Sequence, residues 1–279
     1  MTARSTSRLV SVLGLVATSA MAAGCAARFA PVRESNVPLV EPAAVSIDRI
    51  ELGYSNMFLL RGATSNLVLV DAGSPSDVER TVNALATIGK TPSDVKAVVL
   101  THGHGDHAGM GSFFQKAGAK IIVGRGDELQ TTTGKNDEMP PTGLFARVLK
   151  PFVKLDYEPF TPDVLVDDTL DLAPWGLPGV IVTHVPGHTR GSLVVRPRAR
   201  EAIVGDMILG GMWGGMFHGR AAGDHYYQLD PARNRCNVQA LLDDGVETFH
   251  IGHGGPVTRD SVLQWSESWD RDEMTKCRS

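Results

Sequence analysis

Cysteine is scarce in this sequence, and its spacing excludes one class of metal site. The 279 residues contain three cysteines, Cys25, Cys236 and Cys277, and none has a partner at CxxC or zinc-ribbon spacing. Structural zinc sites made of thiolates need such paired cysteines. Any metal site in this chain is therefore not built from thiolates. A disulfide between Cys236 and Cys277 is compatible with an oxidising compartment, but the sequence alone leaves this pairing open.

The sequence also lacks an excess of positive charge. Its formal net charge is −4, with 27 lysine and arginine residues against 31 acidic residues. A general nucleic-acid binder carries a basic excess, so we expect no nucleic-acid partner. The Gly-x-Ser-x-Gly elbow of serine hydrolases is absent as well, and the region after residue 46 has no internal repeat or low-complexity tract.

A long hydrophobic run is missing near the N-terminus. The apolar residues 9–23 follow Arg4 and Arg8, and they are too short for a comfortable membrane span, which is the pattern of an export signal. The residues Ala22-Ala23-Gly24-Cys25 resemble a bacterial lipobox, although Ala22 stands where leucine is usual. This resemblance implies a lipid anchor on Cys25 at the periplasmic face of a bacterial membrane. An ordinary signal peptide or an uncleaved N-terminal anchor remains the alternative.

These patterns divide the chain into three parts. Residues 1–25 are predicted to be a signal peptide that ends in the lipobox. Residues 26–46 contain three prolines and no helical or strand period, so we predict a linker. Residues 47–279 are predicted to form one folded domain, which is an ordinary length for a single large domain.

The first part of this domain alternates between strand and helix patterns. Strands are predicted at residues 66–73, 95–100 and 120–123, and helices at 76–89 and 107–116. Ser76 and Glu79 have the spacing of a capping box at the start of the first helix, and Gly89 ends it. This alternation predicts an α/β fold.

The rest of the domain is irregular at first and then regular. Residues 124–162 are apolar but broken by Pro140, Pro141 and Gly143, and two interpretations stay open: a helical pair over a sheet edge, or a flap over the site. Further elements are expected as strands at 164–172, 179–185, 192–197, 201–205 and 247–251, a helix from Asp230-Pro231 to 245, and a closing helix from Thr258.

Four metal-competent side chains follow the strand predicted at residues 95–100. They are His102, His104, Asp106 and His107. The intervening glycines allow a tight turn, and neutral imidazole and carboxylate are the ligands of catalytic zinc sites. His102 and His104 can point the same way, whereas Asp106 and His107 suit a second position nearby. The loop therefore predicts a metal site, and not an ordinary surface loop.

The motif His102-x-His104-x-Asp106-His107 resembles the signature of the metallo-β-lactamase-fold superfamily. Further family motifs follow in the expected order, to about Pro256: one around His188, a strand ending in Asp206, and a glycine-rich turn with His253. The resemblance implies a four-layer αββα sandwich with two β-rich halves. The site of this family lies at one edge, between the two sheets.

The resemblance also implies the ligands. His102, His104 and His188 would bind one metal, Asp106, His107 and His253 a second, and Asp206 would bridge them. Two zinc ions per chain are expected, with iron or manganese as alternatives. Asp71 matches the acid of the family's first motif, and we expect it to hold a ligand or the metal loop in place.

The expected activity is metal-dependent hydrolysis of a small molecule. A metal-bridging hydroxide would attack a carbonyl ester, lactone, thioester or amide, and Asp106 would bind metal and orient or accept the proton of the nucleophile. True β-lactamases of this fold lack the bridging aspartate, so Asp206 disfavours that alternative. Glyoxalase II-like thioesterases carry a longer C-terminal part, and the 23 residues after Pro256 are closer to lactonase-like members. The remaining alternatives are an iron-dependent oxidoreductase similar to persulfide dioxygenases and a binding protein with a vestigial site.

The other histidines are expected outside the site. His184 and His250 lie within predicted strands and are interpreted as packing residues or neighbours of the ligands. His218 and His225 fall in residues 210–228, which are rich in glycine, methionine and aromatic residues. We interpret that segment as a loop that either shapes an apolar substrate pocket or packs against itself.

Overall fold

The computed structural model describes residues 45–279 apart from 154, 213–216, 276 and 278–279. The predicted signal peptide and all but the last two residues of the predicted linker lie outside the described residues. The first described strand begins at Ser46, one residue before the predicted start of the folded domain. Among the described residues, no helix is both long and apolar enough to cross a membrane.

Six strands form the first sheet. In order across the sheet they are β1 (Ser46–Glu51), β2 (Asn56–Arg61), β3 (Leu67–Val70), β4 (Val95–Val99), β5 (Lys120–Gly124) and β6 (Val164–Val166). The strands from β3 to β6 run parallel, and those from β1 to β3 are antiparallel. Because β3 and β4 are parallel, their carboxyl ends meet at one edge. Asp71 and the metal loop therefore emerge side by side.

The second sheet also has six strands. In order they are β14 (Val257–Thr258), β13 (Thr248–Ile251), β10 (Glu201–Gly205), β9 (Leu193–Arg198), β8 (Ile181–His184) and β7 (Thr169–Asp171). Only β10 and β13 run parallel among these pairs of described strands. Asp206 follows β10 and His253 follows β13, so this parallel pair places both side chains at the same edge.

The helices and one hairpin complete the described fold. They are α1 (Val78–Thr87), α2 (Gly105–Ala108), α3 (Gly111–Lys116), α4 (Glu128–Thr133), α5 (Leu144–Leu149), α6 (Pro231–Asp243), α7 (Arg259–Ser266), α8 (Arg271–Thr275), and the hairpin of β11 (Leu209–Met212) with β12 (Phe217–Gly223). Short 3-10 turns lie at Pro75–Asp77, Pro92–Asp94, Lys150–Phe152 and Ala173–Trp175.

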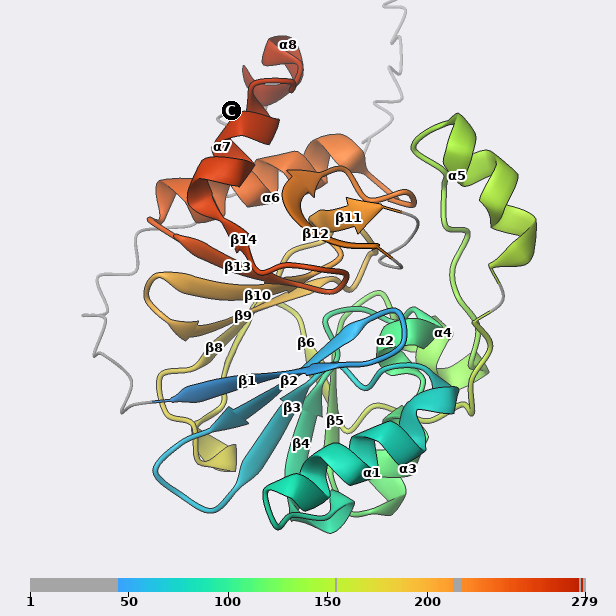
Figure 1. The fold of residues 1–279 in the computed structure, drawn as a ribbon, viewed down its shortest axis with the longest axis vertical. Helices are drawn as coiled ribbons and strands as arrows, with labels where there is room; N and C mark the ends of the chain where they lie inside the picture. The colour runs from blue at the N-terminus through green and yellow to red at the C-terminus, as the bar shows by residue number, and fades with distance from the viewer. Residues whose placement is uncertain (1–44, 154, 213–216, 276, 278–279) are drawn as a thin grey trace, which may run out of the picture. The chain divides into compact units, whose positions relative to one another are not determined.

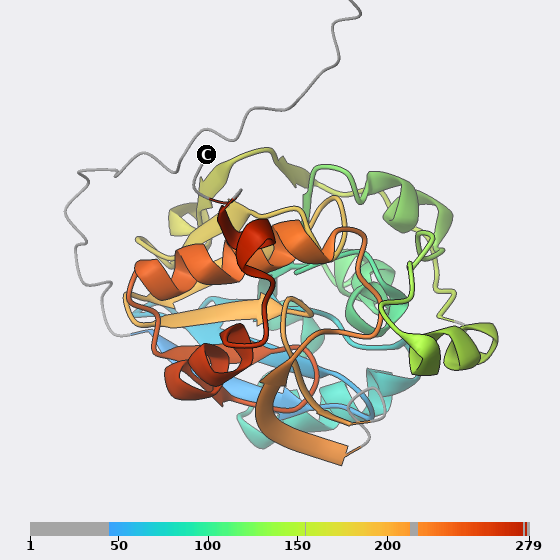
Figure 2. The same ribbon diagram turned by 90° about the horizontal axis from the view of Figure 1, so that it is seen from above.

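Three of the four buried apolar clusters in the described part of the chain hold the two sheets and their covering helices in four layers. Phe58 of β2 faces the core between the two sheets, while its neighbour Leu59 faces the outer core under α1 and α3. On the second sheet, Phe249 packs with α6 and α7 on the opposite outer face. Figure 1 shows α1 and α3 against the first sheet and α6 and α7 against the second, and Figure 2 shows α6 from above. The predicted αββα sandwich is confirmed.

Several predicted elements were wrong in detail. The single strand predicted at 164–172 is two strands, β6 and β7, which belong to different sheets, because the chain turns between them at two aspartates. The helix predicted at 107–116 is split into α2 and α3 at Gly109. The capping box uses Ser74 and Asp77, and not Ser76 and Glu79: the Asp77 carboxylate accepts from the Ser74 backbone N–H at 3.0 Å. Part of the predicted loop 210–228 is the β11–β12 hairpin.

Other local predictions held. The Asp230 side chain caps α6 by accepting from the Arg233 backbone N–H at 3.0 Å, and Thr258 caps α7. The cysteine pairing that the sequence left open is present: Cys236 of α6 and Cys277 after α8 form a disulfide with a Cα–Cα distance of 5.3 Å. The disulfide ties the C-terminal helical segment to α6, and it leaves neither of these cysteines available as a metal ligand.

The segment 124–162 does not form the helical pair that was one of its two interpretations. The helix α5 stands away from both sheets in Figures 1 and 2, and Leu144, Val148 and Phe152 are exposed around it. Between α4 and α5, Asn136 and Asp137 reach the metal loop. The Asn136 side-chain oxygen accepts from the Gly105 backbone N–H at 2.9 Å. This contact favours the interpretation that places the segment beside the site.

Candidate metal centre

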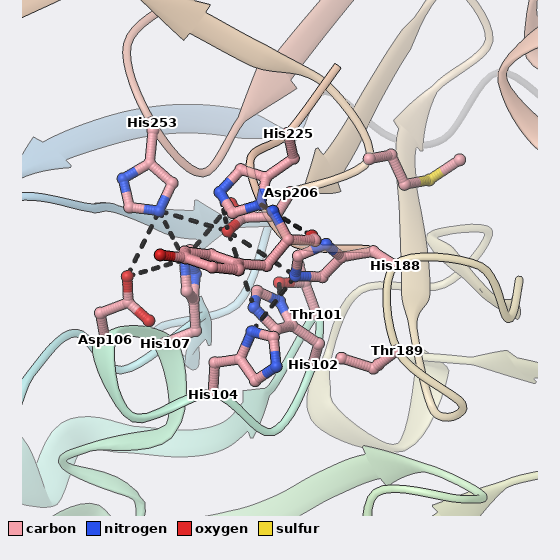
Figure 3. A network of polar contacts seen from close by, with 12 residues as sticks. Thr101, His102, His104, Asp106, His107, His188, Thr189, Asp206, His225 and His253 are labelled. Atoms are coloured by element: carbon pink, nitrogen blue, oxygen red, sulfur yellow. Dashed lines mark hydrogen bonds and ion pairs between the residues drawn. The ribbon is translucent and has the colours of Figure 1, made fainter. Parts of the chain in front are cut away.

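The structure brings all seven predicted ligands to the edge where the strand ends of both sheets meet. Figure 3 shows their side chains pointing toward one another. Four groups of three have donor atoms within 4.8 Å of one another: His102, His104 and His188; His102, His107 and Asp206; Asp106, His107 and His253; and His188, Asp206 and His225. Six of the seven are buried, and only Asp106 is half-buried.

Asp71 fixes the start of the metal loop. Its carboxylate accepts from the Thr101 backbone N–H at 2.7 Å and from the Thr101 hydroxyl at 2.9 Å. The other oxygen lies 2.9 Å from Nδ1 of His107. Asp71 has a φ of 68°, a left-handed conformation that aspartate tolerates better than most residues. The predicted role, a residue that holds a ligand and the loop in place, agrees with these contacts.

Asp127 fastens the metal loop to the turn that carries His188. This buried carboxylate accepts from the Gly103 backbone N–H at 2.9 Å, the Thr189 hydroxyl at 2.7 Å and the Gly191 backbone N–H at 2.8 Å. Burial raises the pKa of Asp127, and these hydrogen bonds oppose that rise only in part. Asp127 could not be predicted as part of the site, because in the sequence an aspartate before a helix is indistinguishable from an ordinary cap.

Asp206 lies at the middle of the cluster. Its Oδ2 is 3.1 Å from Nε2 of His225, 3.2 Å from that of His253, and 3.8 Å from those of His102 and His188, while its Oδ1 is 3.4 Å from Nε2 of His107. Gly252 is needed beside it, since a Cβ there would collide with Asp206 and His107. This position lets one carboxylate face histidines from both groups.

The donor atoms fit a divalent metal. Nε2 of His102 and Oδ1 of Asp206 are buried and have no hydrogen-bond partner among the described residues. Nδ1 of His104 and Nε2 of His188 face each other at 3.2 Å, and Nε2 of His107 and of His253 do so at 3.4 Å. Ligands about 2.1 Å from a tetrahedral zinc stand roughly 3.4 Å apart. Buried polar atoms without partners are costly, and a cation would satisfy them.

Comparison with known proteins gives the family. The family model described as "Metallo-beta-lactamase superfamily" matches residues 50–253. This chain belongs to the metallo-beta-lactamase superfamily. The "Probable metallo-hydrolase YflN" of Bacillus subtilis (strain 168) is 27% identical over 236 residues, which are 77% of this chain and 86% of that protein.

Two further relatives of this superfamily member match over shorter lengths. A hydroxyacylglutathione hydrolase of Anaeromyxobacter dehalogenans is 28% identical over 74% of this chain and 64% of that protein. Metallo-beta-lactamase domain-containing protein 1 of Rattus norvegicus is 45% identical, but over only 58 residues, 21% of this chain and 23% of that protein. A solved structure of a metallo-beta-lactamase family protein from Thermus thermophilus shares the fold, with a TM-score of 0.56, 21% identity and coverage of 84% of this chain and 79% of that one.

The electrostatic environment divides the histidines of this superfamily member into two kinds. Burial, followed by the neighbouring imidazoles, holds the pKa values of His102 and His188 well below their ordinary value. Burial also acts against protonation of His107 and His253. The charge of Asp206 opposes burial at both residues, together with Asp71 and Asp106 at His107 and with Asp106 at His253. The pKa of His107 is raised well above its ordinary value, and that of His253 is raised to about 10. The pKa values of Asp106 and Asp206 are lowered by these histidines, although burial opposes the shift.

The two histidines interpreted as neighbours stay out of the cluster. The ring nitrogens of His184 lie 3.1 Å from the Asp167 carbonyl oxygen and 2.9 Å from that of Arg190. Nε2 of His250 lies 2.8 Å from the Glu201 carboxylate. Neither residue belongs to a group of described side chains that could hold a metal. Both side chains therefore lie apart from the predicted ligands, and it stays a prediction that they do not bind metal.

Two residues beside the ligands were missed. The Asp137 carboxylate lies 3.0 Å from Nε2 of His104, and His225 is part of the cluster itself. Asp137 comes from the irregular segment 124–162, where no sequence pattern points toward the metal loop. His225 precedes two tyrosines in a segment interpreted as a loop, and no strand was predicted before it, although the structure has β12 ending at Gly223. The side chain of His218 lies outside the described residues.

Proposed function

We propose that the protein is a metal-dependent hydrolase with two metal ions held by the seven predicted residues. His102, His104 and His188 would hold one ion, and Asp106, His107 and His253 would hold the other, since each set forms a group of close donor atoms. Asp206 would serve both ions, because its carboxylate faces histidines of both sets. The observation that carries this proposal is the convergence of buried donor atoms without hydrogen-bond partners around Asp206. Zinc is the proposed metal because imidazole and carboxylate donors without thiolate suit catalytic zinc sites.

The chemistry of hydrolysis follows from this donor set. Ions bound here would polarise a substrate oxygen and make water a usable nucleophile at neutral pH. Asp106 is the more accessible carboxylate of the pair, with 14% of its side chain exposed against 2% for Asp206. Its lowered pKa keeps it ionised near neutral pH, so it can orient an attacking water or accept its proton.

The proposed substrate is a small molecule with a carbonyl ester, lactone, thioester or amide. Support comes from the relatives named as a metallo-hydrolase and a hydroxyacylglutathione hydrolase. A panel of these four substrate classes, assayed on protein of measured metal content, tests the proposal. We expect hydrolysis of at least one class, lost on treatment with a chelator and restored by zinc. Protein that carries one iron per chain, consumes oxygen and hydrolyses none of the substrates would contradict it.

We also propose that the mature protein is anchored by a lipid on Cys25 at the periplasmic face of a bacterial membrane. The lipobox-like residues Ala22 to Cys25 support this proposal. Replacement of Cys25 by serine should move the protein from the membrane fraction to the soluble fraction or block its processing. Ala22→Leu, which restores the usual residue of the motif, is the matched control and should keep the membrane location. Unchanged fractionation of Cys25→Ser would contradict the lipid anchor.

A further inference from the structure

His225 enters the cluster from a part of the chain that carries none of the seven predicted ligands. It lies between β12 and α6, and it is buried, with 6% of its surface exposed. Its Nε2 lies 3.1 Å from Oδ2 of Asp206, closer than any of the four predicted histidine ligands that face this carboxylate. Figure 3 shows the ring directed at Asp206 beside His253 and His188.

The ring of His225 is oriented in the same way as that of one predicted ligand. Its Nδ1 lies 3.0 Å from the carbonyl oxygen of Tyr227 and 3.3 Å from the backbone nitrogen of the same residue, and both contacts leave Nε2 facing the cluster. His253 repeats this arrangement, with Nδ1 2.7 Å from the carbonyl oxygen of Tyr54. A histidine that binds a metal characteristically donates its other ring N–H to a backbone carbonyl or a carboxylate, which fixes the tautomer. His225 has this anchor.

The neighbours of His225 belong to both halves of the centre. Its ring lies 4.8 Å from that of His188, nearly perpendicular to it, and 5.7 Å from that of His253, in a stacked arrangement. Its donor nitrogen shares a group with His188 and Asp206 in which all donor atoms lie within 4.8 Å. The ion proposed for His102, His104 and His188 would therefore have His225 within its reach as well.

Contacts with residue Thr142 and with Ala146 of α5 fix the position of His225. The Thr142 hydroxyl donates to the His225 carbonyl oxygen at 2.9 Å, and the Thr142 backbone N–H donates to the Tyr226 carbonyl oxygen at 2.9 Å. The Tyr227 hydroxyl donates to the Ala146 carbonyl oxygen at 3.0 Å. The side chain is thus presented by a backbone that is held on both sides, as a preorganised ligand requires.

We propose that His225 is an eighth metal ligand, which binds the ion held by His188 and Asp206. This inference rests on the proposed function, because it assumes that the cluster holds metal. Ligation by His225 would link the metal centre to residues 142–146 through the hydrogen bonds of Thr142 and Tyr227. The centre would then be built from three regions of the chain: the metal loop, the strand ends of the second sheet, and the segment before α6.

Cobalt binding by the full chain tests this inference without reference to activity. Metal-free wild type, His225→Ala and His250→Ala would be titrated with Co²⁺ in competition with a chromophoric chelator, and their visible spectra recorded. His250 is the matched control, because it also contacts a carboxylate, Glu201, at 2.8 Å but lies outside the cluster. We expect His225→Ala to bind one of the two ions at least about 10-fold more weakly and to change the cobalt bands. His250→Ala should match the wild type.

A second variant separates ligation from a purely structural role. His225→Gln keeps a hydrogen-bond donor toward Asp206 but replaces imidazole with a poor ligand, and we expect it to lose affinity as His225→Ala does. Circular dichroism of the metal-free proteins shows whether each variant folds. Wild-type cobalt affinity and spectrum in folded His225→Ala, or their recovery in His225→Gln, would overturn the inference. Failure of the wild type itself to bind metal would instead overturn the proposed function.

Discussion

The two halves of the candidate metal centre hold similar histidines in opposite electrostatic surroundings. Around His102 and His188, burial and neighbouring imidazoles lower the pKa values. Around His107 and His253, the carboxylates outweigh the effect of burial and raise the pKa values, to about 10 for His253. His102 and His188 are therefore neutral near neutral pH, whereas His107 and His253 hold protons that a bound metal would have to displace.

This difference shows what the carboxylates contribute. Neutral histidines bind a metal without losing a proton, whereas protonated ones must release it, so metal affinity in the second half depends on pH. The negative charges of Asp106 and Asp206 attract the cation, and this attraction offsets the cost of releasing the histidine protons.

Replacement of Asp206 should affect both halves and remove the electrostatic difference between them, because this carboxylate faces histidines of both halves. We expect Asp206→Asn to weaken binding of at least one ion and to reduce turnover by roughly 10³-fold, since a lost ion removes several kcal/mol of charge stabilisation. Metal analysis and kinetics on the purified variant provide the measurement. Full activity with both ions retained would show that Asp206 is only an acid at a strand end.

Replacement of Asp71 should affect mainly the second half. Asp71→Asn keeps the left-handed backbone but weakens the anchor on Nδ1 of His107. Removal of such an anchor typically lowers metal affinity by about 10- to 100-fold. Competition with a chelator should show one weakened ion and one of unchanged affinity. Equal weakening of both ions would argue that Asp71 supports the whole loop and not one half.

The two halves should change the stability of the metal-free protein in opposite directions as the pH rises. The raised pKa values of His107 and His253 contribute stability that is complete below pH 6.5 and is lost as pH rises toward about 10. The lowered pKa values of His102 and His188 make the folded state less stable as pH falls below 6.5. Maximum stability should therefore lie near pH 6.5. Each proton by which the folded and unfolded states differ changes the free energy of unfolding by at most about 1.4 kcal/mol per pH unit.

Urea unfolding of the metal-free protein between about pH 5 and 9 measures this profile. This pH range covers roughly one to three units on either side of the ordinary histidine pKa. His253→Gln should reduce the loss of unfolding free energy above about pH 6.5. His188→Gln should reduce the loss of unfolding free energy below about pH 6.5. A wild-type profile that rises steadily from roughly pH 6.5 to 9 would contradict the electrostatic contrast.

The smallest effects are expected for the histidines outside the centre. His184→Ala and His250→Ala should leave the metal count unchanged and alter the free energy of unfolding by roughly 0.5–3 kcal/mol, as ordinary substitutions do. His188→Ala and His253→Ala should each lower metal content and activity together. Metal content of the four purified variants is the measurement, and loss of metal in His184→Ala or His250→Ala would show a misassigned motif.

The fold and the positions of the seven residues could be predicted largely because local sequence patterns indicate them. Strand ends followed by glycine-bounded turns marked the metal loop, His188 and His253. The break between β6 and β7 could not be predicted, because an apolar run does not show which sheet each half will join. His225, Asp127 and Asp137 were missed for a related reason. Their positions depend on contacts with residues far away in the sequence, and no local pattern records those contacts.

The number of metal ions that the metal-free full chain binds tests the proposed centre most directly. Zinc titration by calorimetry, on wild type and on the double variant His188→Ala/His253→Ala, measures that number. Two ions per wild-type chain and a clear loss in the double variant are the predicted result, because the double variant lacks one ligand in each half. Wild type that binds no zinc, or a double variant that still binds two ions with wild-type affinity, would contradict the proposed centre.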